Sequence, residues 1–186
     1  MSILRKIYRF FIDIAQTLLL AASIFIVIYI FLLRPYQVSG ASMFPSFEDK
    51  EYVLTSVISL RFEQLKRGDV IVFKAPTDAE KDFIKRVIGL PGDTVSVKDG
   101  DVYVNDRKLD QSGFLKSDVK TFGGNFLKEG QPIAVPDSSY IVMGDNRPNS
   151  SDSREWGFVK TGSIIGKSFF VYLPLNKMRL VKNPFN

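Results

Sequence analysis

The pattern of hydrophobic and polar positions divides the chain into one long apolar segment near the N-terminus and a series of short alternating runs after it. Residues 14–33 carry no charged side chain, and their polar-bearing residues are only Gln16, Thr17, Ser23 and Tyr29. A helix of this length, at about 1.5 Å per residue, spans about 30 Å, which matches the hydrocarbon thickness of a bilayer. The pattern therefore predicts a membrane-spanning helix.

Two alternatives to an anchor are a buried helix of a soluble core and a cleaved secretory signal. A core helix of a soluble domain usually has one polar face, whereas this segment is apolar all round. A secretory signal has an apolar stretch of about 7–15 residues and then small residues at its cleavage site. Residues 32–36 read Leu-Leu-Arg-Pro-Tyr, a poor cleavage site, so the pattern favours an uncleaved anchor.

After the anchor, Pro35 and Gly40 break the helix, and short runs rich in β-branched and aromatic residues predict strands. Residues 98–101 read Lys-Asp-Gly-Asp, which is typical of a hairpin turn. The regular spacing of the runs predicts an all-β domain, a folded-over or barrel-like antiparallel sheet, behind one N-terminal transmembrane helix. The predicted strands lie at 52–54, 69–73, 83–88, 94–97, 101–104, 139–143 and 168–172.

We expect two parts, a cytoplasmic N-terminus with its transmembrane anchor at 1–34 and an extracytoplasmic β domain at 35–186. A variable lobe is expected to be inserted at about 97–135, because residues 111–135 contain several glycines and few periodic apolar positions. Basic residues precede the anchor at Arg5, Lys6 and Arg9, whereas Arg34 alone follows it directly. The positive-inside bias then predicts an N-terminus in the cytoplasm and a β domain outside the cytoplasmic membrane.

The net charge of +5 raises the question of a nucleic-acid partner. Residues 1–34 contain four basic residues and one acidic residue, which leaves 21 basic and 19 acidic residues in the rest of the chain. A net charge of +2 is typical of an ordinary solvated surface, so we expect no nucleic-acid partner.

The chain contains no Cys and no His. The first absence excludes disulfides, a cysteine nucleophile and thiolate metal sites, and the second excludes a Ser-His-Asp triad within this chain. The usual His or Cys zinc sites are excluded by the same two absences. A hydrolase with this composition must take its base from Lys, Asp, Glu or Tyr.

Three segments are candidates for chemistry. Residues 39–46 read Ser-Gly-Ala-Ser-Met-Phe-Pro-Ser, a small-residue turn with room around the Ser42 hydroxyl. Strand alternation in residues 82–93 puts Lys85 on one face with apolar Phe83 and Val87, and burial there lowers the pKa of an amine. Residues 144–154 form a polar stretch between two strands. Taken singly, these features also fit a plain turn, an edge-strand lysine and a solvated loop.

Together, and in this order, the three segments and the Arg-Gly-Asp-Val-Ile-Val-Phe run at 67–73 resemble the motifs of bacterial type I signal peptidases. These are Ser–Lys proteases that remove signal peptides from exported proteins, and the chain looks like their short Gram-positive-type form. The resemblance covers the anchor and nearly all of the β domain except about residues 111–135. Two positions depart from the family pattern, since Ser46 stands where Thr is usual and Phe83 where Tyr is common.

The resemblance implies roles for particular residues. Ser42 would be the nucleophile, Lys85 the general base and Ser150 the residue that orients the lysine amine. Asp152 and Arg154 would form a structural ion pair, and Asp145 would be the acid of a turn. The oxyanion hole would use the Ser42 backbone N–H, with the Gly40 backbone or a water as the second donor.

The resemblance also implies the partners. The substrate would be a preprotein with small residues at the first and third positions before the cut, and its extended chain would pair with an exposed strand edge. The candidate substrate-binding residues are Gln37, Val38, Ser39, Asp82 and Phe83, with Ile84 beside them. No metal or organic cofactor is implied. We further expect contact between the lipid bilayer and an aromatic rim of Phe44, Phe47, Trp156 and Phe158, although the last two would alternatively fill the core.

Two other functions compete with this interpretation. A self-cleaving Ser–Lys protease of the SOS-repressor type would carry a DNA-binding domain, whereas an apolar segment occupies the N-terminus here. A non-catalytic anchored β domain would have no need for both Ser42 and Lys85. Cleavage of a second protein in trans separates both competitors from a signal peptidase.

Overall fold

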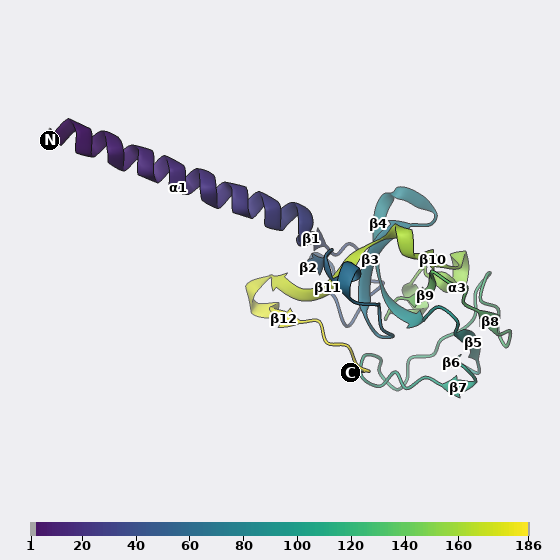
Figure 1. The fold of residues 1–186 in the computed structure, drawn as a ribbon. Helices are drawn as coiled ribbons and strands as arrows, with labels where there is room; N and C mark the ends of the chain where they lie inside the picture. Colours follow the sequence, from purple (N-terminus) through teal and green to yellow (C-terminus); the bar gives the residue numbers. More distant parts are fainter. Residues whose placement is uncertain (1–2, 186) are drawn as a thin grey trace.

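The computed structural model describes residues 3–185 and consists of one long N-terminal helix that projects from a β domain (Figure 1). The helix, α1, spans Ile3–Phe31, so it begins well before the apolar segment from which we predicted it. Within the described residues, α1 is the one helix that is long and apolar enough to cross a membrane. Its side chains stand clear of the β domain, as expected for a segment without a polar face.

The β domain contains two antiparallel sheets, so the predicted all-β class is confirmed. The larger sheet has the order β1-β2-β11-β3-β4-β9-β10, with β12 paired to β11, and the smaller has the order β7-β6-β5-β8. The strands of the larger sheet are β1 Leu33–Gln37, β2 Tyr52–Ser56, β3 Val70–Ala75, β4 Asp78–Gly89, β9 Ser139–Met143, β10 Val159–Lys160, β11 Ile164–Leu173 and β12 Arg179–Leu180. Those of the smaller sheet are β5 Thr94–Lys98, β6 Asp101–Val104, β7 Arg107–Lys108 and β8 Ile133–Ala134.

Each predicted strand is present, and the main differences lie at the ends of strands and in short pairings. β4 and β11 both begin earlier than predicted, because pairing with β3 extends both strands beyond their apolar runs. The β1 strand was not predicted, since Arg34 and Pro35 interrupt its apolar pattern. The predicted hairpin joins β5 to β6, with positive φ at Asp99 and Gly100. Short helices α2 Ser59–Phe62, α3 Ser153–Trp156, η1 Arg147–Asn149, η2 Thr161–Ser163 and η3 Leu175–Lys177 connect the strands.

Three hydrophobic clusters form the core, and strand β4 contributes to each of them. Ile88 packs with the smaller sheet, Val87 packs with β3 and β9, and Ile84 packs against a cluster that contains Met43 and Phe47. The side chains of β4 are therefore packed in all three clusters. This packing fixes the position of the strand that carries Lys85.

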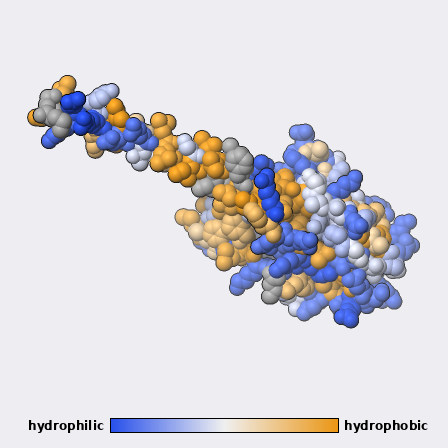
Figure 2. All heavy atoms as spheres, viewed as in Figure 1, coloured by the Kyte–Doolittle hydropathy of each residue, from blue (hydrophilic) through white to orange (hydrophobic). Residues whose placement is uncertain are grey.

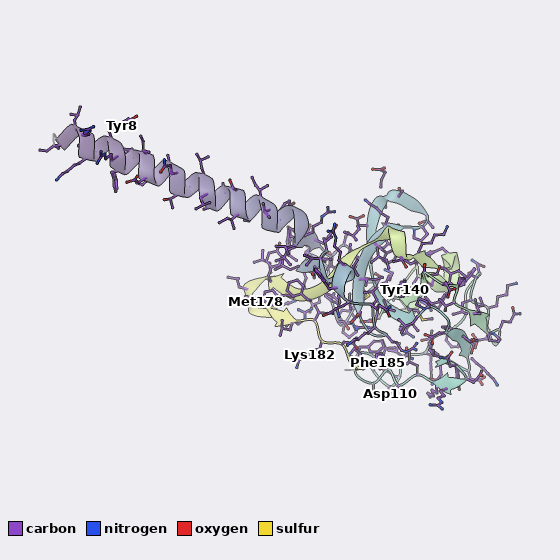
Figure 3. The ribbon with its side chains drawn as sticks, in the orientation of Figure 1. Tyr8, Asp110, Tyr140, Met178, Lys182 and Phe185 are labelled. Atoms are coloured by element: carbon purple, nitrogen blue, oxygen red, sulfur yellow. The ribbon has the colours of Figure 1, made fainter. Side chains whose placement is uncertain are left out.

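Hydrophobic side chains also gather on the surface beside the point where α1 joins the domain (Figure 2). Figure 3 places Met178 at this end of the domain. The exposed residues of this group come from the end of β11 to β12 and are Leu173, Leu175, Met178 and Leu180.

Candidate active site

The turn that carries Ser42 is anchored by buried residues that follow the serine. Met43 and Phe47 are buried in the core, and the Phe47 N–H donates to the Met43 carbonyl at 2.9 Å. Gly40 has a φ of +86°, a left-handed conformation that glycine adopts without strain. Ser42 itself is only half-buried. The fixed turn thus presents a serine hydroxyl at the surface of the domain.

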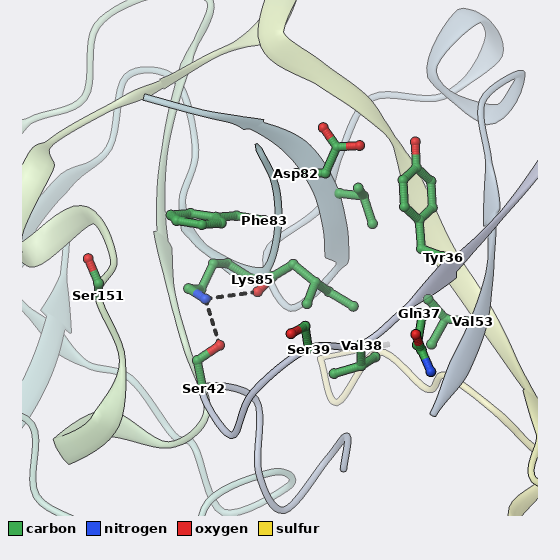
Figure 4. Close-up of a pocket in the computed structure, with 12 residues that line it drawn as sticks. Tyr36, Gln37, Val38, Ser39, Ser42, Val53, Asp82, Phe83, Lys85 and Ser151 are labelled. Carbon is green, nitrogen blue, oxygen red and sulfur yellow. Dashed lines mark hydrogen bonds between the residues drawn. The ribbon is translucent and has the colours of Figure 1, made fainter. Parts of the chain in front are cut away.

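Lys85 reaches this hydroxyl from β4. Its Nζ donates to Ser42 Oγ at 2.7 Å and to the Ile84 carbonyl at 3.1 Å (Figure 4). The Lys85 side chain is 4% exposed, and the face of the Phe83 ring lies 5.3 Å from Nζ. The two residues that the sequence singled out for chemistry, 43 positions apart, are therefore in direct contact.

Burial lowers the pKa of the Lys85 amine from 10.5 to about 8. The carboxylates of Asp152 and Asp145 oppose this shift because they favour the charged ammonium form. A neutral amine has a lone pair that accepts the proton of a serine hydroxyl at hydrogen-bond distance. The arrangement can therefore activate Ser42 without a histidine.

The 144–154 loop packs directly on the serine turn. The Asn146 backbone N–H donates to the Ser42 carbonyl and its side-chain Nδ2 to the Ala41 carbonyl, each at 3.0 Å. Asp152 forms an ion pair with Arg154, with 2.8 Å between Oδ1 and Nε, and its other oxygen accepts the Gly144 N–H at 3.0 Å. The loop holds the carbonyl side of the turn and leaves the Ser42 hydroxyl facing Lys85.

Asp145 has a partner that the sequence did not identify. Its carbonyl accepts the Arg147 N–H within the turn, and its carboxylate pairs with the guanidinium of Arg86. Arg86 follows Lys85 directly and is itself 3% exposed. The available signal was an arginine on the same strand face as Ile84 and Ile88, because a buried guanidinium requires a partner of opposite charge.

Ser150 is not brought into hydrogen-bond contact with Lys85. Its Oγ is buried and has no hydrogen-bond partner among the described residues. It lies against Gly144 and near the Ser42 carbonyl, since a methyl group added to Gly144 would collide with both. The orienting role that the family resemblance implies for Ser150 stays a prediction.

The expected oxyanion donors differ in availability. The Gly40 N–H donates to Asp49 Oδ1 at 2.7 Å, so in this structure the amide is engaged by a carboxylate. Within residues 3–185, the Ser42 N–H has no hydrogen-bond acceptor. The Ser42 amide is thus free to stabilise a developing oxyanion, whereas Gly40 serves to shape the turn.

A pocket of about 220 Å³ opens beside Ser42 and Lys85 (Figure 4). It lies between two strand edges, because β1 is at the end of the larger sheet and β4 pairs with β9 only from Arg86 onward. All five candidate substrate-binding residues line it, together with Tyr36, Ser42, Val53, Val72, Ile84, Lys85 and Ser151. The site therefore offers unpaired backbone groups on both walls of a small pocket.

The four residues of the predicted aromatic rim differ in exposure. Phe44 is exposed, whereas Phe47 is 2% exposed, so the prediction is wrong for Phe47. Trp156 and Phe158 are half-buried: Trp156 packs on Phe73 at 6.0 Å between ring centroids, and Phe158 packs edge-on against Phe126 at 5.1 Å. Lipid contact of the rim stays a prediction, and a separate exposed hydrophobic group lies at 173–180.

Comparisons with known proteins agree with the geometry. Residues 11–173 match the family model described as signal peptidase, peptidase S26. The chain is 36% identical to a signal peptidase I of Bacillus amyloliquefaciens, covering 91% of this chain and 92% of the relative. It is 34% identical to signal peptidase I T of Bacillus subtilis, covering 92% and 90%. It is 32% identical to signal peptidase IB of Staphylococcus aureus, covering 94% and 97%.

Among solved structures, a signal peptidase I of Enterococcus faecalis V583 is 32% identical to this chain. The match covers 56% of this chain and 97% of that one, with a TM-score of 0.47.

Proposed function

Since the chain belongs to the peptidase S26 family of signal peptidases, we propose that it removes N-terminal signal peptides from exported preproteins with Ser42 as nucleophile and Lys85 as general base. The observation that carries the assignment of roles is the 2.7 Å contact between Lys85 Nζ and Ser42 Oγ in a desolvated setting. Both residues line the same pocket, which gives a peptide access to them.

In the proposed reaction, neutral Lys85 takes the proton of Ser42 as Oγ attacks the scissile carbonyl. The resulting oxyanion is stabilised by the free Ser42 N–H. The protonated amine then gives its proton to the leaving amino group, which leaves an acyl-enzyme. A water molecule, deprotonated by the same lysine, hydrolyses the acyl-enzyme and restores Ser42.

We propose that the segment before the cut binds as an added strand between the edge at Gln37, Val38 and Ser39 and the edge at Asp82 and Phe83. Support comes from the position of both segments at strand edges, where outward-facing backbone groups can form main-chain hydrogen bonds with any extended sequence. The Val38 N–H and carbonyl are bound to Glu51 and Lys50, so Val38 would contribute its side chain. The small volume of the pocket favours small side chains at the positions that point into it.

We also propose that residues 1–34 form the cytoplasmic N-terminus and membrane anchor and that residues 35–186 form the catalytic domain outside, with an inserted lobe at about 97–135. The basic residues before the anchor support this orientation. The exposed hydrophobic group at 173–180 supports contact between the domain and lipid, because such a group is costly to leave in water.

The test is cleavage of a preprotein by the purified full chain in detergent. Ser42→Ala and Lys85→Ala are expected to abolish cleavage while the circular dichroism spectrum stays unchanged. Exposed Ser117→Ala and Lys160→Ala serve as matched controls and are expected to keep full activity. Cleavage by Lys85→Ala at a rate near that of the wild type would show that another base acts.

A further inference from the structure

A second pocket lies on the other side of the 144–154 loop from the site described above. It has a volume of about 630 Å³ and is formed between the inserted lobe, around Lys120 and Phe122, and the loop around Arg147 and Ser150. Neither the mechanism nor the proposed binding of the segment before the cut uses this space.

Two adjacent serines separate the two pockets. Ser151 lines the pocket that contains Ser42 and Lys85, whereas Ser150 lines the pocket against the lobe. Ser150 also lies close to the Ser42 carbonyl, because both groups contact the same face of Gly144: a Cβ built on Gly144 would collide with each of them. The lobe-side pocket is therefore close to the proposed nucleophile, and only the 144–154 loop separates the two pockets.

The order of residues along the first pocket sets the direction of a bound chain. Tyr36 and Val53 lie at one end of it, Ser42 and Lys85 lie further along, and Ser151 lies at the opposite end (Figure 4). If the segment before the cut fills the space from Tyr36 to Ser42, the segment after the cut leaves past Ser151. Ser150, which precedes Ser151 in the chain, lines the lobe-side pocket.

The lining of the second pocket suits a polypeptide. Phe122 is 63% exposed although it is a large aromatic residue, and it offers an apolar surface at the edge of the pocket. Buried Arg147 donates only to neutral oxygen atoms, those of Gly144, Thr121 and Gln111, and among the described residues no carboxylate lies within ion-pair distance of it. Asp118 and Glu155 also line the pocket, so it combines an apolar rim with side chains of both charges.

We propose that this lobe-side pocket binds the polypeptide segment that follows the scissile bond, with Phe122 packing against its side chains. This inference rests on the proposed function and adds a binding site for the mature part of the substrate. On this proposal, the inserted lobe binds the part of the substrate that follows the scissile bond.

The test compares two peptide substrates that are identical up to the cut and extend two or eight residues beyond it. With the full-length enzyme in detergent, the longer peptide is expected to have the lower KM, and Phe122→Ala is expected to raise its KM about fivefold with kcat unchanged. The KM of the shorter peptide is expected to stay the same.

Phe62→Ala is the matched control, because Phe62 is 80% exposed on α2 and lines neither pocket. An equal KM for both peptides, or an equal effect of Phe122→Ala on both, would overturn the proposal while leaving the proposed function intact. Failure of the wild type to cut either peptide or a full preprotein would overturn the function itself. The thermal unfolding midpoint of Phe122→Ala shows whether a loss of activity reflects folding.

Discussion

Arg86 and Asp145 form a buried ion pair with two hydrogen bonds, 2.9 Å between Nε and Oδ1 and 2.6 Å between Nη2 and Oδ2. Their side chains are 3% and 0% exposed. The pair joins the strand position next to Lys85 to the start of the 144–154 loop, which in turn holds the Ser42 turn through Asn146. The relative position of base and nucleophile therefore depends on this contact.

Arg86→Met is expected to lower the free energy of unfolding by about 3–5 kcal/mol, because it leaves the Asp145 carboxylate buried without a partner. Chemical denaturation in detergent measures the loss. The double variant Arg86→Met with Asp145→Leu is expected to be more stable than Arg86→Met alone, since it removes both charges. Equal stability of the single and double variants would mean that the buried charge is not the cause.

The pH profile should follow the ionisation of Lys85. The neutral amine is the reactive form and burial lowers its pKa to about 8, so kcat/KM is expected to fall about tenfold per pH unit below pH 8 and to level off above it. Rates measured from pH 5 to pH 10 on a substrate without titrating groups test this. Lys85→Arg should be inactive throughout, because a guanidinium stays protonated. Near-maximal activity at pH 5 would rule out a lysine base.

Met43 and Phe44 are neighbours in the serine turn, but one is buried and the other exposed. Their alanine variants should therefore differ in stability if Met43 anchors the turn. Met43 is fully buried and Phe44 is 51% exposed. Met43→Ala is expected to cost about 2–5 kcal/mol of stability through the cavity it leaves, and Phe44→Ala no more than about 0.5 kcal/mol. Denaturation curves of the two variants provide the measurement. Similar losses would contradict the buried anchor.

The orientation of the chain in the membrane can be tested with single cysteines, because the sequence contains none. In intact cells, a membrane-impermeant maleimide is expected to label Lys128→Cys in the lobe and to leave Lys6→Cys unlabelled. Both positions are exposed in the structure, so detergent should make both reactive. Labelling of Lys6→Cys in intact cells would reverse the proposed topology.

Lipid contact is expected at the 173–180 group and not at the buried residues of the predicted rim. In a Trp156→Phe background, Met178→Trp gives a single fluorophore at the end of the domain beside α1 (Figure 3). Brominated lipids in nanodiscs are expected to quench it strongly. Phe122→Trp, in the lobe on the side away from α1, is the control and should be quenched weakly. Equal quenching at both positions would contradict a lipid-facing surface at Met178.

Local patterns were sufficient for the main elements, whereas the roles of Ser42 and Lys85 followed from the resemblance of several ordered motifs to one family. A charge-free apolar segment marks a membrane helix whatever follows it, and alternation with Gly and Pro punctuation marks strands. The absence of His and Cys left few bases, and the apolar face of residues 83–87 identified Lys85 as the buried one. Short ladders such as β7 and β10 escaped prediction, because two-residue pairings leave no period in the sequence.

The sequence by itself thus determined an apolar helix, an all-β domain and a Ser–Lys pair, since each follows from residue types within a few positions or from a family motif. Only the tertiary structure decided which distant groups meet. It paired Asp145 with Arg86, bound the Gly40 amide to Asp49 and placed Ser150 in the lobe-side pocket. It also buried Phe47 and packed Trp156 against a hydrophobic cluster. These outcomes depend on the order in which strands pair and on how the sheet folds over itself. A contact between residues tens of positions apart is therefore selected by packing and by the need to satisfy buried polar groups, neither of which a local pattern contains.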